Sequence, residues 1–234
     1  MKTIIVSDLH NRVDWVEPVL SSIQYDRVIF LGDYFDDFND TDEDITTVAE
    51  WLKLSLTQKK RVHLMGTHDM WYRFPYNRFL MASGNTPRKS RIINGIINKE
   101  EWNTLLLDWY EQGFLITHAG LHPSFVKDNS YCRFIKPAIE KALQDVGNGK
   151  INPLLDAGFA RGGLQPFGGI TWLDWYDEFE PVPYLNQIVG HTQLRYPEEK
   201  SIENSKNYCL DTKNNHIGIL ENNVVTWMKN PKVH

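Results

Sequence analysis

Five short apolar runs occur along the chain, and an aspartate or a histidine follows each of them within three residues. Runs of this kind, which have no polar face, predict strands that are buried on both sides, as in a parallel sheet. Because ligands of open α/β sheets bind at the carboxyl ends of the strands, the polar residues after the runs are candidates for a site. The predicted strands cover residues 2–7, 28–31, 62–65, 114–117 and 188–189.

Between these runs, apolar residues recur with helical spacing and predict crossover helices. A long segment at 70–110 is also helical in pattern and rich in aromatic residues, and we interpret it as an insertion that covers the site. Residues 156–183 carry many glycines and prolines and predict a long irregular loop, which in a compact domain is usually functional. The other predicted elements are helices at 14–23, 44–57 and 134–146 and strands at 208–210, 216–220 and 224–228, with a hairpin turn at 221–223.

Composition narrows the class of protein. A chain of 234 residues with 41% hydrophobic residues suits one domain spanning 1–234. The formal net charge of -5 argues against a broad nucleic-acid-binding surface but leaves small phosphorylated substrates open. Two cysteines exclude a disulfide scaffold, and no apolar run approaches the ~20 residues of a membrane span. Because the chain enters a strand at once, leaving no room for a signal peptide, we expect a cytoplasmic protein without a membrane partner.

The residues that end the runs are better explained by metal ligation than by helix capping, because capping has no use for histidine. Two divalent ions about 3.5 to 4 Å apart can activate a water and clamp a phosphoryl group, and they need one carboxylate that reaches both. Asp33 is the candidate bridge. Asp8 and His10 would complete the first ion site, since residues i and i+2 of an extended segment point the same way, and His118 and His191 the second. A mixed Asp/His set favours manganese, with iron, zinc or nickel as alternatives.

The same positions form five motifs in order along the chain. These motifs resemble the five conserved blocks of the calcineurin-like metallophosphoesterases, in particular the branch of the phosphoprotein phosphatases and bacterial diadenosine tetraphosphate hydrolases. The resemblance implies a four-layer α-β-β-α sandwich, with two metals between the sheet ends. The motifs are Asp8-Leu9-His10, Gly32-Asp33-Tyr34-Phe35-Asp36, Gly66-Thr67-His68-Asp69, His118-Ala119-Gly120-Leu121-His122-Pro123 and Gly190-His191-Thr192.

The resemblance also implies roles for three further residues. His68, paired with Asp36, would protonate the leaving-group oxygen. That pairing is chemically sound, because a carboxylate orients the imidazole ring and raises its pKa. Arg161, in the segment Ala160-Arg161-Gly162-Gly163, would bind phosphate oxygens bidentately.

The chain departs from the family pattern at three places. Thr67 stands where the family has an asparagine ligand of the second metal, so that ion is expected to bind weakly or through water; natural variation and an engineered change are both compatible with this residue. Asp37 and Phe38 replace an arginine and a glycine of the phosphoprotein phosphatases, which argues against a folded phosphoprotein as substrate. Asn11 replaces a glycine.

These features predict a dinuclear metal-dependent phosphoesterase that hydrolyses a phosphomonoester, a phosphodiester or a small nucleotide by in-line displacement. Two alternatives stay open at this point. One is a catalytically impaired metal-binding module that recognises a phosphorylated ligand or partner, and the other is a metal-dependent nuclease. The physiological substrate and the oligomeric state are left undetermined by the sequence.

Overall fold

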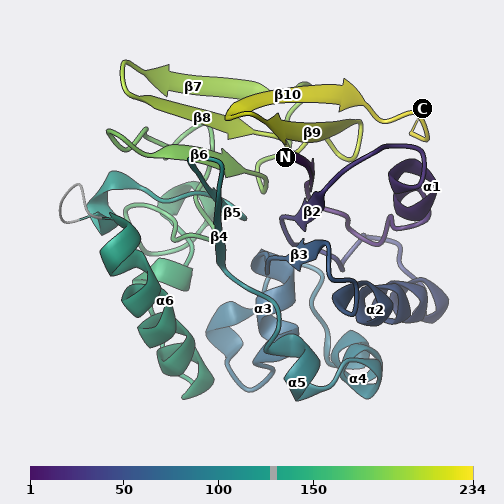
Figure 1. Cartoon of the computed structure of the whole chain (residues 1–234). Helices are drawn as coiled ribbons and strands as arrows, with labels where there is room; N and C mark the ends of the chain where they lie inside the picture. The colour runs from purple at the N-terminus through teal and green to yellow at the C-terminus, as the bar shows by residue number, and fades with distance from the viewer. Residues whose placement is uncertain (127–130, 234) are drawn as a thin grey trace.

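Two five-stranded sheets form the centre of the protein (Figure 1) in a computed structural model that describes residues 1–126 and 131–233. The first sheet has the strand order β10-β9-β1-β2-β3, in which β1, β2 and β3 are parallel and β9 and β10 are antiparallel additions. Its strands are β1 (Lys2–Val6), β2 (Arg27–Phe30), β3 (Arg61–His63), β9 (His216–Glu221) and β10 (Val224–Lys229).

The second sheet has the order β4-β5-β6-β8-β7, with a parallel centre of β5, β6 and β8 and an antiparallel strand at each edge. The parallel centres arise from apolar runs without a polar face, as the sequence predicted. The strands are β4 (Asp108–Glu111), β5 (Phe114–Thr117), β6 (Asn186–Val189), β7 (Glu198–Ile202) and β8 (Ser205–Cys209).

Alternation along each strand fills two separate hydrophobic cores. One set of side chains meets between the sheets, where Ile5, Ile29 and Leu31 of the first sheet pack with Phe114 and Ile188 of the second. The alternate residues of the first sheet face the helices α1 (Val16–Leu20) and α2 (Asp42–Leu56) in a larger cluster. These contacts give the expected layers of two sheets packed with helices.

The outer face of the second sheet is covered differently. The helix α6 (Tyr131–Gly147) lies on this side of the molecule (Figure 1), together with the segment 156–183. Leu173, Trp175 and Phe179 of that segment pack on Val189 and Cys209 of the sheet. The segment is irregular, as predicted, with only the short 3-10 turn η4 (Phe159–Arg161) in it, while η3 (Pro153–Leu155) precedes it.

The segment at 70–110 contains helices, as predicted, but its last residues do not form a helix. It holds the helices α4 (Pro87–Ile96) and α5 (Lys99–Trp102) and the 3-10 turn η1 (Arg78–Leu80), and α3 (Thr67–Arg73) leads into it. Residues 108–111, however, form β4 rather than a helix. The reason is the following Gln112-Gly113 pair, whose φ angles of 47° and 79° suit a two-residue hairpin turn that pairs β4 with β5.

The strand β7 was missed from sequence because its residues Glu198–Ile202 are mostly charged or polar. It is an edge strand, and charged side chains protect such edges from pairing with other chains. The predicted hairpin at 221–223 is present, with Asn222 and Asn223 at φ 52° and 62° between β9 and β10. Within residues 1–126 and 131–233, no helix has both the length and the apolar character needed to cross a membrane.

Candidate metal centre

The parallel strands of both sheets end at one place, and polar residues follow each of them. Five of these residues belong to the predicted motifs, and the sixth, Asp211, was given no role from sequence although it also follows a strand. The residues are Asp8 after β1, Asp33 after β2, Thr67 at the start of α3, His118 after β5, His191 after β6 and Asp211 after β8.

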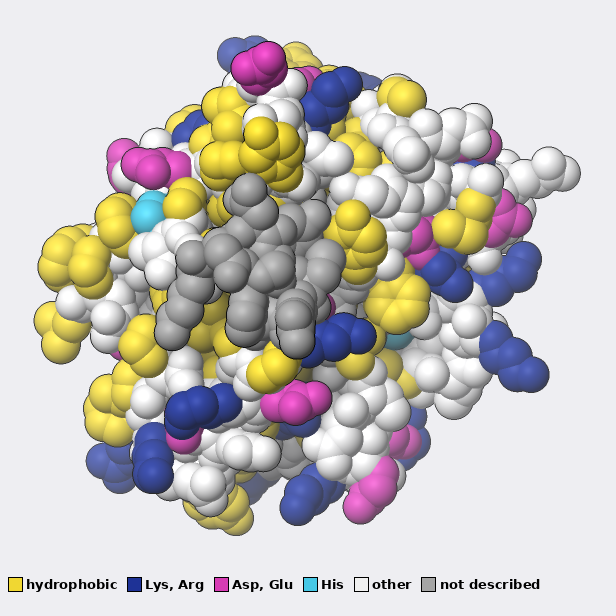
Figure 2. Space-filling view, turned by 60° about the vertical axis from the view of Figure 1, so that its left-hand side comes forward, with side chains coloured by type: hydrophobic (Ala, Val, Ile, Leu, Met, Phe, Trp, Pro, Cys, Tyr) yellow, Lys and Arg dark blue, Asp and Glu magenta, His cyan; other side chains and the backbone are white. Residues whose placement is uncertain are grey.

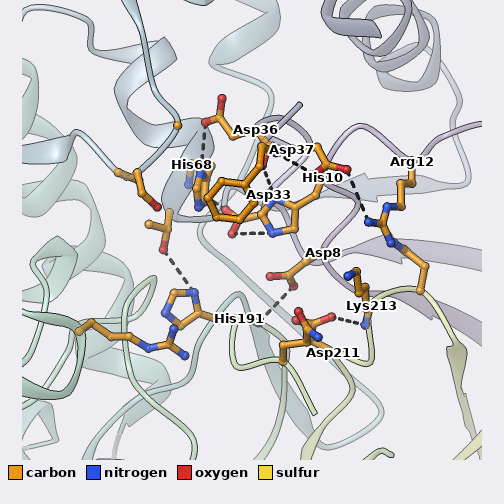
Figure 3. A pocket seen from close by; sticks show the side chains of 18 of the residues that line it. Asp8, His10, Arg12, Asp33, Asp36, Asp37, His68, His191, Asp211 and Lys213 are labelled. Carbon is orange, nitrogen blue, oxygen red and sulfur yellow. Dashed lines mark hydrogen bonds and ion pairs between the residues drawn. The ribbon is translucent and has the colours of Figure 1, made fainter. Parts of the chain in front are cut away.

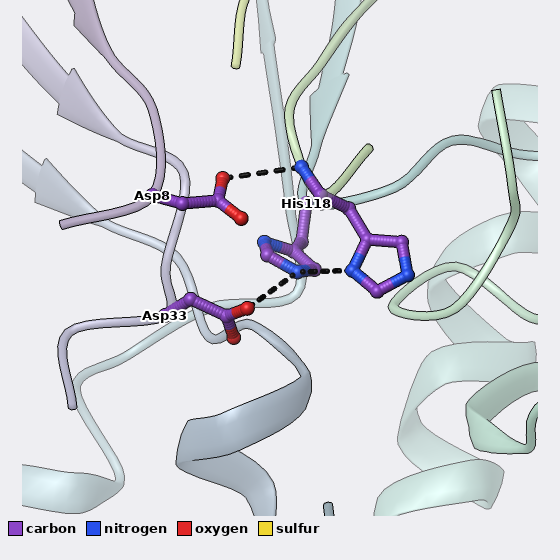
Figure 4. Close-up of side chains that lie close together, drawn as sticks. Asp8, Asp33 and His118 are labelled. Atoms are coloured by element: carbon purple, nitrogen blue, oxygen red, sulfur yellow. Dashed lines mark hydrogen bonds and ion pairs between the residues drawn. The ribbon is translucent and has the colours of Figure 1, made fainter. Parts of the chain in front are cut away.

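Four of the predicted ligands form one compact group. Single donor atoms of Asp8, Asp33, His118 and His191 all lie within 4.8 Å of one another. Asp8 and Asp33 reach into this group from the first sheet and His118 from the second (Figure 4). His118 Nε2 lies 3.4 Å from Asp33 Oδ2 and 3.1 Å from His191 Nδ1. The fold therefore converts four positions spread over the sequence into a set of ligand atoms around one point.

A second group contains His10, Asp33 and His68. His10 Nε2 lies 3.8 Å from Asp33 Oδ2. Asp33 belongs to both groups, as a bridging carboxylate must. Asp8 and His10 fall in different groups because the backbone of His10 is left-handed (φ 42°), so the segment is not extended as the sequence argument assumed.

The electrostatics of the first group favour a cation. Burial opposes protonation of His118, but the charges of Asp33 and Asp8 outweigh it and raise the pKa of His118 to about 10. Burial and the neighbouring His118 instead lower the pKa of His191. The Nε2 atom of His191 is buried and has no hydrogen-bond partner among the described residues. Two buried carboxylates, two histidines and an unpartnered ring nitrogen match the donor set of a divalent transition-metal ion.

Glycine is needed next to these ligands because the backbone approaches them closely. A Cβ atom on Gly190 would lie 2.5 Å from Asp8 Oδ1, and one on Gly66 would collide with Asp33 Oδ1. Asp33 and His191 themselves have left-handed backbones, with φ 50° and 66°. Strained conformations of non-glycine residues are typical of functional sites.

Thr67 lies at the edge of the first group but outside it. Its hydroxyl donates to the carbonyl oxygen of Thr171 and lies 3.5 Å from His191 Nδ1. The side chain is therefore close to the group of candidate ligands. Its hydroxyl proton is donated to a carbonyl oxygen of the irregular segment 156–183.

His68 and Asp36 form the pair that the resemblance implied. Nδ1 of His68 lies 3.0 Å from Asp36 Oδ2. Burial lowers the pKa of His68, but the charges of Asp33 and Asp36 and the hydrogen bond to Asp36 outweigh it, so that the pKa of this histidine is raised. Burial likewise raises the pKa of Asp36, and its hydrogen bonds, first of all to His68, reverse that effect. The pair thus favours a charged imidazolium beside a charged carboxylate.

The segment 70–110 supplies three partners of Asp36 that sequence reasoning missed. The Tyr72 hydroxyl donates to Oδ1 at 2.5 Å, Asn85 Nδ2 to Oδ2 at 2.6 Å, and Lys89 Nζ to Oδ1 at 2.9 Å. Lys89 also pairs with Asp40 at 2.6 Å, and its side chain is only 6% exposed. No motif signals these residues, because Tyr72 of α3, Asn85 before α4 and Lys89 of α4 meet at Asp36 only through the tertiary fold.

The two groups open into a cavity of about 330 Å³ (Figure 3). Arg161 is one of the residues that line it. Its Nε lies 2.8 Å from Asp174 Oδ2, and its terminal nitrogen donates to Thr192 Oγ1 at 2.9 Å, next to His191. These two contacts hold the guanidinium at the mouth of the site.

One family of known sequences and several solved structures are similar to this chain. The sequence model of the calcineurin-like phosphoesterases matches residues 1–193. A search of curated proteins finds no match. Among solved structures, the chain is similar to a cold-active protein-tyrosine phosphatase of the psychrophile Shewanella sp., with 18% identity, a TM-score of 0.65 and coverage of 98% of this chain and 78% of the other.

Two other solved structures share the fold at lower identity. A putative diadenosine tetraphosphatase has 13% identity and a TM-score of 0.55, with 97% of this chain and 93% of that chain covered. A protein serine/threonine phosphatase from Saccharomyces cerevisiae has 11% identity and a TM-score of 0.55, with 98% and 80% covered.

Proposed function

The chain belongs to the calcineurin-like phosphoesterase family, and from this premise we propose that it hydrolyses a small phosphorylated substrate, a phosphomonoester, phosphodiester or nucleotide, with two divalent metal ions. The observation that carries the proposal is the convergence of Asp8, Asp33, His118 and His191 within 4.8 Å, with Asp33 shared by a second group. Those residues and His10 would hold the ions, for which manganese is the first candidate. When bound, the ions would activate a water and stabilise charge on the phosphoryl oxygens.

The protein's own side chains supply the remaining steps. Because Nδ1 of His68 faces Asp36, its Nε2 is the atom positioned to deliver a proton to the departing oxygen. The raised pKa of His68 favours the protonated form that this step needs. Arg161, fixed by Asp174 and Thr192, would bind phosphate oxygens and orient the substrate.

Hydrolysis of p-nitrophenyl phosphate and bis(p-nitrophenyl) phosphate with added manganese tests the proposal. We expect activity that a chelator removes, and an increase of about tenfold in manganese affinity for Thr67→Asn, since an amide oxygen is a better neutral ligand than a hydroxyl already bonded to Thr171. Thr47→Asn, on an exposed position of α2, is the matched control and should behave like the parent protein. If the parent protein and both variants were inactive, the proposal that this chain is an enzyme would be rejected.

The bond between Thr67 and Thr171 favours one second candidate, a module that binds metal and a phosphorylated ligand but turns over poorly. Retained binding of phosphate without hydrolysis in either Thr67 form would support it.

A nuclease is less well supported, because the net charge is -5. On the described part of the face in Figure 2, basic and acidic side chains are interspersed rather than gathered into one basic stripe. Indifference to single-stranded DNA and RNA at low salt would remove this alternative.

A further inference from the structure

Two cations line the cavity without a part in the chemistry described above. Arg12 lies in the loop after β1, and Lys213 lies in the loop after β8. Lys213 is exposed and makes no ion pair among the described residues. Arg12 has one ion pair, to Asp37 at 3.5 Å, with both side chains more than a third exposed. Such a pair contributes little in water, so the guanidinium is available to a ligand.

One carbonyl group ties the two loops together. The oxygen of Leu9 accepts the backbone N–H of Arg12 at 2.9 Å and the side-chain amide of Asn214 at 3.5 Å. Arg12 and Lys213 accordingly lie on the same side of the cavity in Figure 3, next to Asp8, while His191 lies across from them. Because Arg161 bonds Thr192, the neighbour of His191, the cavity has cations on two separate sides.

The backbone of Lys213 indicates that its position is specified. Its φ is 56° and that of Asn214 is 65°, so both residues of this turn are left-handed, a conformation that side chains other than glycine adopt only at a cost. The Asp211 carboxylate holds this turn by accepting the Lys213 N–H at 3.0 Å. Non-glycine residues held in such conformations are concentrated at ligand-binding sites.

We propose that Arg12 and Lys213 form a subsite for a second phosphate group, so that the substrate carries a phosphoanhydride. This inference rests on the proposed function. The phosphoryl group to be transferred would lie at the ligand groups beside Arg161, and the departing phosphate would lie at Arg12 and Lys213. Water adds its oxygen to the first phosphorus, the anhydride P–O bond breaks, and the departing phosphate keeps the electron pair and takes a proton.

Calorimetric titration of the manganese-loaded protein with inorganic pyrophosphate and with inorganic phosphate tests the subsite without requiring turnover. We expect pyrophosphate to bind at least about tenfold more tightly than phosphate. The variant with both Arg12→Gln and Lys213→Gln should lose about tenfold of that preference, as expected for charge-assisted hydrogen bonds. Blank titrations at the same manganese concentration correct for binding of the metal by pyrophosphate.

Lys206→Gln is the matched control, because Lys206 is exposed and lies near the other end of β8. It should keep the full preference for pyrophosphate. Equal melting temperatures of parent and variants would show that folding is unaffected, and the single variants replace the double one if it is not. An unchanged preference in the double variant would overturn the subsite, whereas absent hydrolysis of p-nitrophenyl phosphate by the parent would reject only the proposed function.

Discussion

The carboxylate of Asp69 accepts the backbone N–H of Asp33 at 2.7 Å and thereby fixes the residue that both candidate metal groups share. The same carboxylate accepts the N–H of Tyr34 at 3.0 Å and that of Gly66 at 2.8 Å. Asp69 is fully buried in the first turn of α3. It therefore ties the loop after β2 to the start of this helix and holds the left-handed backbone of Asp33 in place.

Replacing Asp69 by asparagine should destabilise the protein. An amide has one acceptor oxygen where the carboxylate has two, so at least one of the three buried N–H groups loses its partner, which costs about 1–3 kcal/mol. Urea unfolding measures the loss. The control is Asp42→Asn, at an exposed position of α2, which should change the free energy of unfolding by less than about 0.5 kcal/mol. Equal effects of the two substitutions would show that the three hydrogen bonds accepted by Asp69 do not stabilise the loop after β2.

Two substitutions should separate metal binding from proton transfer. Asp33→Asn should abolish binding of both ions, because this carboxylate is shared by the two groups. His68→Ala should leave the metal content intact and slow turnover, most strongly for substrates with poor leaving groups. Elemental analysis and kcat measured over a series of aryl phosphates test this. Loss of metal from the alanine variant would instead make His68 a ligand, as its place in the second group allows.

Lys89→Met should cost about 3 kcal/mol of stability. The substitution leaves the carboxylates of Asp36 and Asp40, whose side chains are 1% and 5% exposed, without their ammonium partner. Thermal or urea unfolding checks the value. Lys59→Met, on an exposed residue, serves as the comparison, and a similarly small effect at both positions would show that α4 is not fastened through this lysine.

Acid should destabilise the fold partly through His63. Burial, with a smaller effect of Arg61, lowers the pKa of His63 to about 3, while the unfolded chain has the ordinary value of 6.5. Below pH 6.5 the unfolded state therefore binds a proton that the folded state does not, and stability falls with pH. The loss is roughly 3 kcal/mol between pH 7 and pH 4. Urea unfolding as a function of pH should show a shallower decline for His63→Gln, and parallel curves would contradict the assignment.

The sequence predicted the parallel strands well and singled out the residues that follow them as candidate ligands, because both depend on local chemistry. An apolar run followed by Asp8, Asp33, His118 or His191 already indicates a buried strand that ends at a site. The errors fall where tertiary pairing overrides the local pattern. The aromatic sequence of β4 looks helical until its hairpin with β5 is known, and the charged β7 looks like a loop until β8 supplies its partner.

What the sequence determined by itself is therefore the kind of centre, namely carboxylates and imidazoles placed after buried strands. Only the tertiary structure decided which of them share a point, that His10 and His68 lie in a different group from Asp8, and that Lys89 and Asp69 hold the centre from outside it. The physical reason is that strand propensity and ligand chemistry act over a few residues. Contacts between residues 36 and 89 or 9 and 214 instead depend on how two sheets, a helical segment and several strained loops pack together.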